Sequence, residues 1–180
     1  MAYYGAEAAV EALDEFLQDA TYGLNAELAT MRTALSVTTD NLPDVAAFEK
    51  YYPKDLQGRS FPHLSMVYIS DTAEQQANSR MINVDIEIRL TVLDLNVDGG
   101  ASDVGLATCR YRDAMTKIFL RRTPMGKQGW TLSNGGTAAT GRVIRCTIES
   151  NMLAFDPEIQ ASTPNMMLRT SLLVRMQEDY

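Results

Sequence analysis

The clearest pattern along the chain is a strict alternation of apolar and polar residues between Ile82 and Val92. A period of two places alternate side chains on opposite faces of an extended strand, so the segment predicts a long strand with one buried and one polar face. Two apolar residues, Val92 and Leu93, then follow each other, which predicts a bulge or a bend. The predicted buried face holds Ile82, Val84, Ile86, Ile88, Leu90 and Val92; the polar face holds Asn83, Asp85, Glu87, Arg89 and Thr91.

Three further segments, residues 61–70, 141–152 and 166–177, have the same strand-like alternation. The wholly polar segment 71–80 predicts a loop or the tip of a hairpin before the long strand. The apolar faces of the last two strands are predicted to hold Ile144, Cys146 and Ile148, and Leu168, Leu172, Val174 and Met176.

In two segments the apolar residues recur with helical spacing. Residues 6–31 predict one helix, with Gly23 as a mildly unfavourable residue in its middle, and Asp103 to Arg121 predict another. Pro43 and Pro53 bracket a predicted short helix. The predicted apolar faces are Val10, Leu13, Leu17, Ala20, Leu24, Leu28 and Met31 in the first helix, and Ala107, Tyr111, Ala114, Met115 and Ile118 in the second.

Strands outnumber helices, and short connections join most of them. The chain is therefore predicted to be a single α+β domain over residues 1–180. Its mixed or antiparallel sheet should have about four to five strands, with helices packed on one face. The other sheet face should meet solvent or another subunit.

The composition fits a globular protein, since 46% of the 180 residues are hydrophobic and 22% are charged. No apolar run reaches the roughly 20 residues that span a bilayer, and the N-terminus lacks the features of a signal peptide. We therefore expect a soluble, cytosolically made protein. The formal net charge of −7 argues against a duplex-binding protein that neutralises phosphates, although DNA could pass an acidic surface without sticking.

The chain contains few residues suited to catalysis. Cys109 and Cys146 lack metal-ligand spacing and are expected to be small core residues, and His63 has no acid near it in sequence. Asp85 and Glu87 share a strand face and could form an acid/base or metal pair. Cross-strand ion pairs with Arg145 or Arg175 explain them better. We expect no cofactor, no metal and no enzyme, and keep a small enzyme or ligand-binding domain at His63 or Asp85/Glu87 as the alternative.

Charged residues gather on the two predicted helices. Such clusters are either solvated faces or contact surfaces for a partner of opposite charge. The acidic residues are Glu7, Glu11, Asp14 and Glu15 on the first helix, and the basic residues are Arg110, Lys117, Arg121 and Arg122 at the second.

The order of these elements resembles the tail terminator and neck proteins of tailed bacteriophages. The resemblance rests on an N-terminal amphipathic helix, the strands "FPHLSMVYIS" and "INVDIEIRLTVLDLN", the helix "ATCRYRDAMTKIFLRR", and the strands "GRVIRCTIESN" and "LLVRMQE". It covers nearly the whole chain and involves no diagnostic motif. Residues 34–52 and 121–136 are longer than the minimal plan of the family, which leaves open another neck ring, such as a head-completion or tail adaptor protein.

The resemblance implies a structural virion protein that assembles in the host cytoplasm. Such proteins form a ring, usually a hexamer, that caps the tail tube and joins it to the head–tail connector proteins. Genomic DNA passes through the lumen without specific binding. A closed ring needs two different complementary patches on each subunit. The resemblance therefore makes the acidic and basic helix residues named above the candidate subunit-interface or lumen residues.

Overall fold

The computed structural model describes residues 5–51, 58–93, 101–120, 141–154 and 165–179. These residues form an α+β fold with a five-stranded mixed sheet, which confirms the predicted class. None of the described helices is long and apolar enough to cross a membrane. The elements are α1 (Gly5–Gln18), α2 (Leu24–Leu35), β1 (Ala47–Glu49), β2 (His63–Gln75), β3 (Ser79–Leu93), α3 (Ala101–Leu120), β4 (Gly141–Ala154) and β5 (Asn165–Asp179).

The long strand β3 lies at the centre of the sheet, whose order is β1-β2-β3-β5-β4. It pairs antiparallel with β5 along its whole length, from Ser79–Asp179 to Leu93–Asn165, and antiparallel with β2 on its other side. Only β1 pairs in parallel, with the start of β2. The long strand predicted from the sequence is therefore the central strand of the sheet.

One face of the sheet carries the core. All six even-numbered apolar residues of β3 from Ile82 to Val92 are buried. α1 and α3 pack against this face and contact each other through the rings of Phe16 and Phe119, whose centroids are 5.7 Å apart. All five residues predicted for the apolar side of α3 are also buried. The prediction of helices on one sheet face is confirmed.

The first predicted helix is wrong in one respect, because it is two helices with a turn at residues 19–23. The Asp19 carboxylate accepts hydrogen bonds from the backbone N–H of Thr21 (2.8 Å) and Tyr22 (2.7 Å). Gly23 N–H donates to the Asp19 carbonyl at 2.9 Å. Ala20 is consequently exposed and Val10 only half-buried, while α1 buries Ala8, Ala9, Ala12, Leu13, Phe16 and Leu17.

The predicted short helix near Pro43 is also wrong. Residues 43–46 are extended and lead into β1. Side chains from the helices satisfy their backbone groups: Asn25 exchanges two hydrogen bonds with the backbone of Val45 (2.8 and 3.2 Å), and the buried Tyr111 hydroxyl donates to the Pro43 carbonyl at 2.6 Å. These tertiary contacts replace the bonds that a helix would have made.

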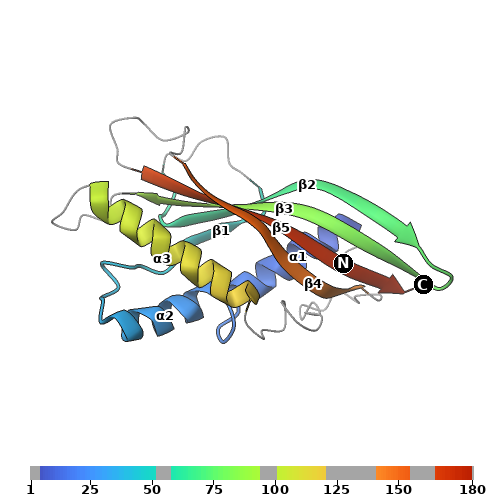
Figure 1. The fold of residues 1–180 in the computed structure, drawn as a ribbon, viewed down its shortest axis with the longest axis horizontal. Coiled ribbons are helices and arrows are strands. Elements are labelled where there is room, and N and C mark those ends of the chain that lie inside the picture. The colour runs from blue at the N-terminus through green and yellow to red at the C-terminus, as the bar shows by residue number, and fades with distance from the viewer. Residues whose placement is uncertain (1–4, 52–57, 94–100, 121–140, 155–164, 180) are drawn as a thin grey trace.

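The β-bulges also differ from expectation. The β3–β5 register runs unbroken through Val92 and Leu93, so no bulge lies there between these strands. Instead Ile69 in β2 is the extra residue between the pairs Tyr68–Ile86 and Ser70–Asp85. β2 then continues to Gln75 through most of the segment predicted as a loop, and the hairpin tip is only residues 76–78. This hairpin lies at the opposite end of the molecule from α2 (Figure 1).

In β4, too, bulges change which residues face the core. Its pairing with β5 skips a residue after Val143 and again after Ile148, so that Ile144 and Glu149 are the extra residues. Val143 and Cys146 are buried and Ile148 half-buried, whereas the Ile144 side chain lies outside the described part of the chain. The predicted core residues of β5 are all buried.

We predict that Gly23→Ala destabilises the fold. A Cβ at Gly23 would lie 2.5 Å from the Asp19 carbonyl oxygen and 2.6 Å from that of Leu17, both backbone atoms that cannot move alone. The free energy of unfolding, measured by urea denaturation, should fall by about 1–3 kcal/mol.

Gly105→Ala is the matched control. A Cβ there meets only the Met166 sulfur, at 3.9 Å, inside α3. Alanine should therefore raise the unfolding free energy by up to about 1 kcal/mol. Equal effects of the two substitutions would contradict the proposed role of the turn.

Candidate functional site

Glu87 is the centre of an ion-pair cluster on the polar face of the sheet. Its side chain is almost buried, and its carboxylate accepts hydrogen bonds from Arg89 (2.6 Å) and from Arg169 on β5 (2.5 and 3.1 Å). Arg89 and Arg169 are opposite each other in the β3–β5 ladder. The carboxylate therefore separates two like charges that would otherwise repel.

The surroundings of Glu87 decide its protonation. Burial works to raise the pKa of this carboxyl, but the hydrogen bonds and charges of Arg169 and Arg89 outweigh burial and lower the pKa below 4.5. Asp85 accepts a separate hydrogen bond from Ser70 at 2.6 Å. The two carboxylates are thus held by other partners rather than paired as an acid/base site.

The two arginines that were expected to form ion pairs with Asp85 and Glu87 form none with them. Arg145 and Arg175 face each other across β4 and β5, and both are exposed. The prediction that one of them pairs with Asp85 or Glu87 is wrong, because Arg89 and Arg169 bind Glu87, and Asp85 accepts its hydrogen bond from Ser70.

His63 does have an acidic neighbour, which the sequence analysis missed. Its Nε2 lies 3.4 Å from Oε2 of Glu49, and the other Glu49 oxygen binds Arg59 at 2.5 Å. Glu49 lies in β1, in the segment predicted to be helical, so its approach to His63 depended on a strand pairing that the local pattern did not show. His63 is only 1% exposed, which closes it to a substrate in this conformation.

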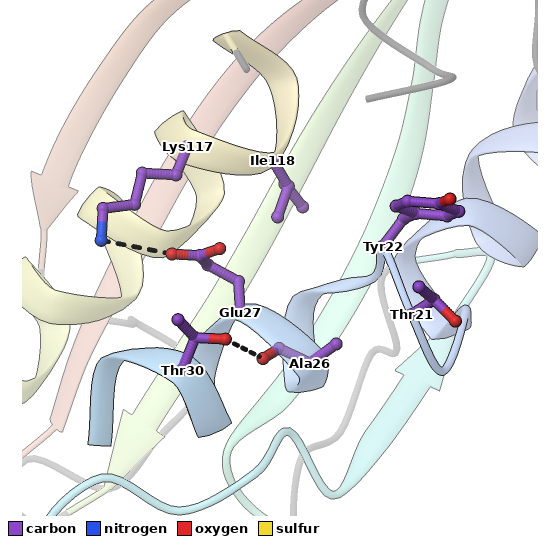
Figure 2. A pocket seen from close by; sticks show the side chains of 7 residues that line it. All are labelled: Thr21, Tyr22, Ala26, Glu27, Thr30, Lys117 and Ile118. Carbon is purple, nitrogen blue, oxygen red and sulfur yellow. Dashed lines mark hydrogen bonds and ion pairs between the residues drawn. The ribbon is translucent and has the colours of Figure 1, made fainter. Parts of the chain in front are cut away.

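A small pocket of about 190 Å³ lies between α2 and α3, where Glu27 and Lys117 face each other (Figure 2). The Lys117 ammonium is 3.2 Å from the Glu27 carboxylate. A charged ligand would have to break this ion pair. The ion pair is therefore better explained as a contact that joins α2 to α3 than as part of a binding site. Thr21, Tyr22, Ala26, Thr30 and Ile118 complete its lining.

A second hollow, of about 260 Å³, lies between the start of α1 and β2. It is lined by Ala6, Glu7, Val10 and Tyr68. Neither of these two pockets includes His63 or Glu87, so neither supports the alternative site. No group of three or more His, Cys, Asp or Glu residues that could hold a metal ion occurs in the described ranges.

Glu11 and Asp14, two of the four acidic residues predicted for an interface, form ion pairs within the chain. Lys50, just after β1, lies 2.5 Å from Glu11 and 3.5 Å from Asp14. Glu7 is exposed and Glu15 half-buried. Glu7 is therefore the most accessible of the four.

Lys117, one of the four basic residues predicted for an interface, also forms an ion pair within the chain. Lys117 is engaged with Glu27, and Arg110 is half-buried on α3. Arg121 and Arg122 lie outside the described residues. The interface or lumen role of the two sets stays a prediction.

We predict that Glu87→Gln lowers stability at neutral pH. It leaves Arg89 and Arg169 opposite each other without a carboxylate, at a cost of about 1–2 kcal/mol, allowing for the partial exposure of both arginines. The depressed pKa stabilises the folded state above 4.5 and ceases to do so as pH falls through the folded value.

The difference between wild type and variant in urea denaturation should therefore shrink in acid. Glu149→Gln, at an exposed position on β4, should change stability by no more than about 0.5 kcal/mol. A difference that stays constant as the solution is acidified would contradict the role of the Glu87 charge.

The comparisons with known proteins find a likeness in fold. No family model matches the chain, and no curated protein matches it. A solved structure does match: a chain of the virion of native gene transfer agent (GTA) particle, with a TM-score of 0.51 and 14% sequence identity. The match covers 98% of this chain and 99% of that one. At this identity the likeness shows a shared fold from end to end.

Proposed function

We propose that this chain is a structural protein of a phage-like particle. The observation that carries the proposal is the end-to-end match in fold to a virion chain of the gene transfer agent. A fold hosts many functions, so a second kind of support is needed. The titratable groups first considered for catalysis supply it: Glu87 is tied to two arginines, and His63 is inaccessible.

Within that class we propose a ring at the neck of the particle, most simply a tail terminator. This ring would cap the tail tube and join it to the head–tail connector proteins. The order of elements along the chain supports it, as do exposed charges of both signs, Glu74 and Arg145 among them, that have no ion-pair partner among the described residues. Another neck ring, such as a head-completion or tail adaptor protein, would use the same surfaces, and the partner bound would distinguish them.

The charge of the chain suits passage of DNA. With a net charge of −7, a ring of several copies repels the phosphate backbone overall. The proposed role therefore includes close contact with a moving duplex but no sequence-specific or tight binding. A virion location follows from the same role.

The first experiment is the mass of the purified full chain, measured by light scattering over a concentration series, together with negative-stain micrographs. We expect a reversible rise from the mass of one subunit, 19.9 kDa, to a closed ring, with a hexamer as the specific expectation. A single-subunit mass at every concentration, with no rings in the micrographs, would contradict the ring.

A further inference from the structure

The sheet has two free edges among the described residues. β1 covers β2 only from His63 to Ser65, so the outer side of β2 from Met66 to Gln75 has no strand beside it in that part of the chain. β4 is the outermost strand at the other side. An exposed edge presents unpaired N–H and C=O groups to which another chain can bind.

The β2 edge combines apolar and acidic side chains. Tyr68 and Ile69 are 46% and 55% exposed. Asp71, which accepts a hydrogen bond from the Tyr68 hydroxyl, and Glu74 follow them; both are exposed and form no ion pair with any described residue. Beside Tyr68 lies the hollow against the start of α1, which is large enough for one aliphatic side chain.

The β4 edge has the complementary character. Met152 and Leu153 are 48% and 37% exposed. Arg145 lies toward the other end of the strand, opposite Arg175 of β5, and neither arginine has an ion-pair partner among the residues that the structure describes. Among the described residues, each edge thus carries two large apolar residues; the exposed charges without an ion-pair partner are Asp71 and Glu74 on β2, and Arg145 together with the bulge residue Glu149 on β4.

We infer that the β2 edge of one copy docks antiparallel along the β4 edge of a second copy, with Tyr68 against Leu153 and Glu74 near Arg145. The inference rests on the proposed ring, for which it names the contact between neighbouring subunits. In β2 the acidic residues follow the apolar pair, whereas in β4 the basic residue precedes it. Only an antiparallel arrangement brings both matching sets together.

The faces of the two edges agree in this arrangement. Tyr68 is paired with Ile86, and Leu153 with Leu168, so both belong to rows on the core face. Each edge has one bulge residue between the residues that are aligned here: Ile69 lies between Tyr68 and Glu74 in β2, and Glu149 between Leu153 and Arg145 in β4. The two bulges offset each other, and Glu74 and Arg145 both fall on the polar face.

The distances between the apolar and the charged residue on the two edges match to within two residues. Without the bulge residues, Tyr68 to Glu74 spans roughly 17 Å of ladder and Leu153 to Arg145 roughly 24 Å, at about 3.4 Å per residue. With Tyr68 opposite Leu153, Glu74 and Arg145 are diagonal neighbours, which long side chains can bridge. In an antiparallel pairing of two like edges, the apolar end of one copy would instead face the charged end of the other, so the matching sets would not meet. The contact is therefore heterologous and suits a ring.

A charge exchange tests the contact. Arg145→Glu alone and Glu74→Lys alone should each weaken self-association of the full chain roughly tenfold in sedimentation velocity, and the double variant should regain most of it. Asp40→Lys makes the same charge change as Glu74→Lys at an exposed turn after α2 and should leave association unchanged.

The outcomes separate this inference from the proposed function. Rings that form equally well in all variants overturn the contact and leave the ring standing. Loss of association in the single variants without recovery in the double overturns the Glu74–Arg145 pairing. A wild-type chain that never associates overturns both.

A disulfide experiment does not depend on charge. In the proposed alignment Thr72 and Ser150, both exposed on the polar face, are opposite each other across the contact. In a Cys109→Ser background, copies with Thr72→Cys mixed with copies carrying Ser150→Cys should form a disulfide-linked dimer under mild oxidation. Either variant alone should not, and cross-linking no greater in the mixture than in the single variants would overturn the inference.

Discussion

The fold depends on the pairing of β3 on both of its edges. A central strand that is bonded along its length to β5 and through most of it to β2 cannot shift by one residue without turning its six buried apolar side chains to the polar face. Burial of each such side chain is worth roughly 1.5–3 kcal/mol, so the register is strongly fixed. The helices are placed by this register, because α1 and α3 cover the apolar row and meet over it.

The sequence predicted the parts of the fold whose pattern is local. β3, β5 and α3 each bury the set of residues that their own periodicity indicated. The turn at residues 19–23 was missed because a weak periodicity continued across it, while the decisive feature was the close approach of backbone at Gly23. β1 was missed because it depends on pairing with β2, and because side chains distant in sequence, Asn25 and Tyr111, bind the backbone of Val45 and Pro43 just before it. The contact of Glu49 with His63 follows from that missed strand.

The same reasoning explains which part of the candidate site could be foreseen. Composition and spacing indicated correctly that opposite charges are spread over one chain, but spacing does not show which charges bind each other. Lys50 lies far from Glu11 and Asp14 in sequence, yet it engages both. Lys117 is likewise engaged by Glu27 of another helix. Folding therefore pairs several of the charged helix residues, whereas Asp71, Glu74 and Arg145 at the edges of the sheet have no ion-pair partner in the part of the chain that the structure describes.

An antiparallel contact between β2 and β4 keeps the two faces of the sheet distinct from one copy to the next. Every copy would then place its helices on one side of a shared wall and the mixed-charge face, with Glu87 between its arginines, on the other. The apolar face must stay under the helices wherever it lies, since exposing it would cost the burial that fixes β3. The polar face is solvated only in part, because Ser65, Glu87 and Thr91 on it are buried, while positions such as Thr72 and Arg175 are exposed. A long strand with one apolar and one charged face thus serves two purposes: the first face holds each subunit together, and the exposed part of the second can contribute to the assembly.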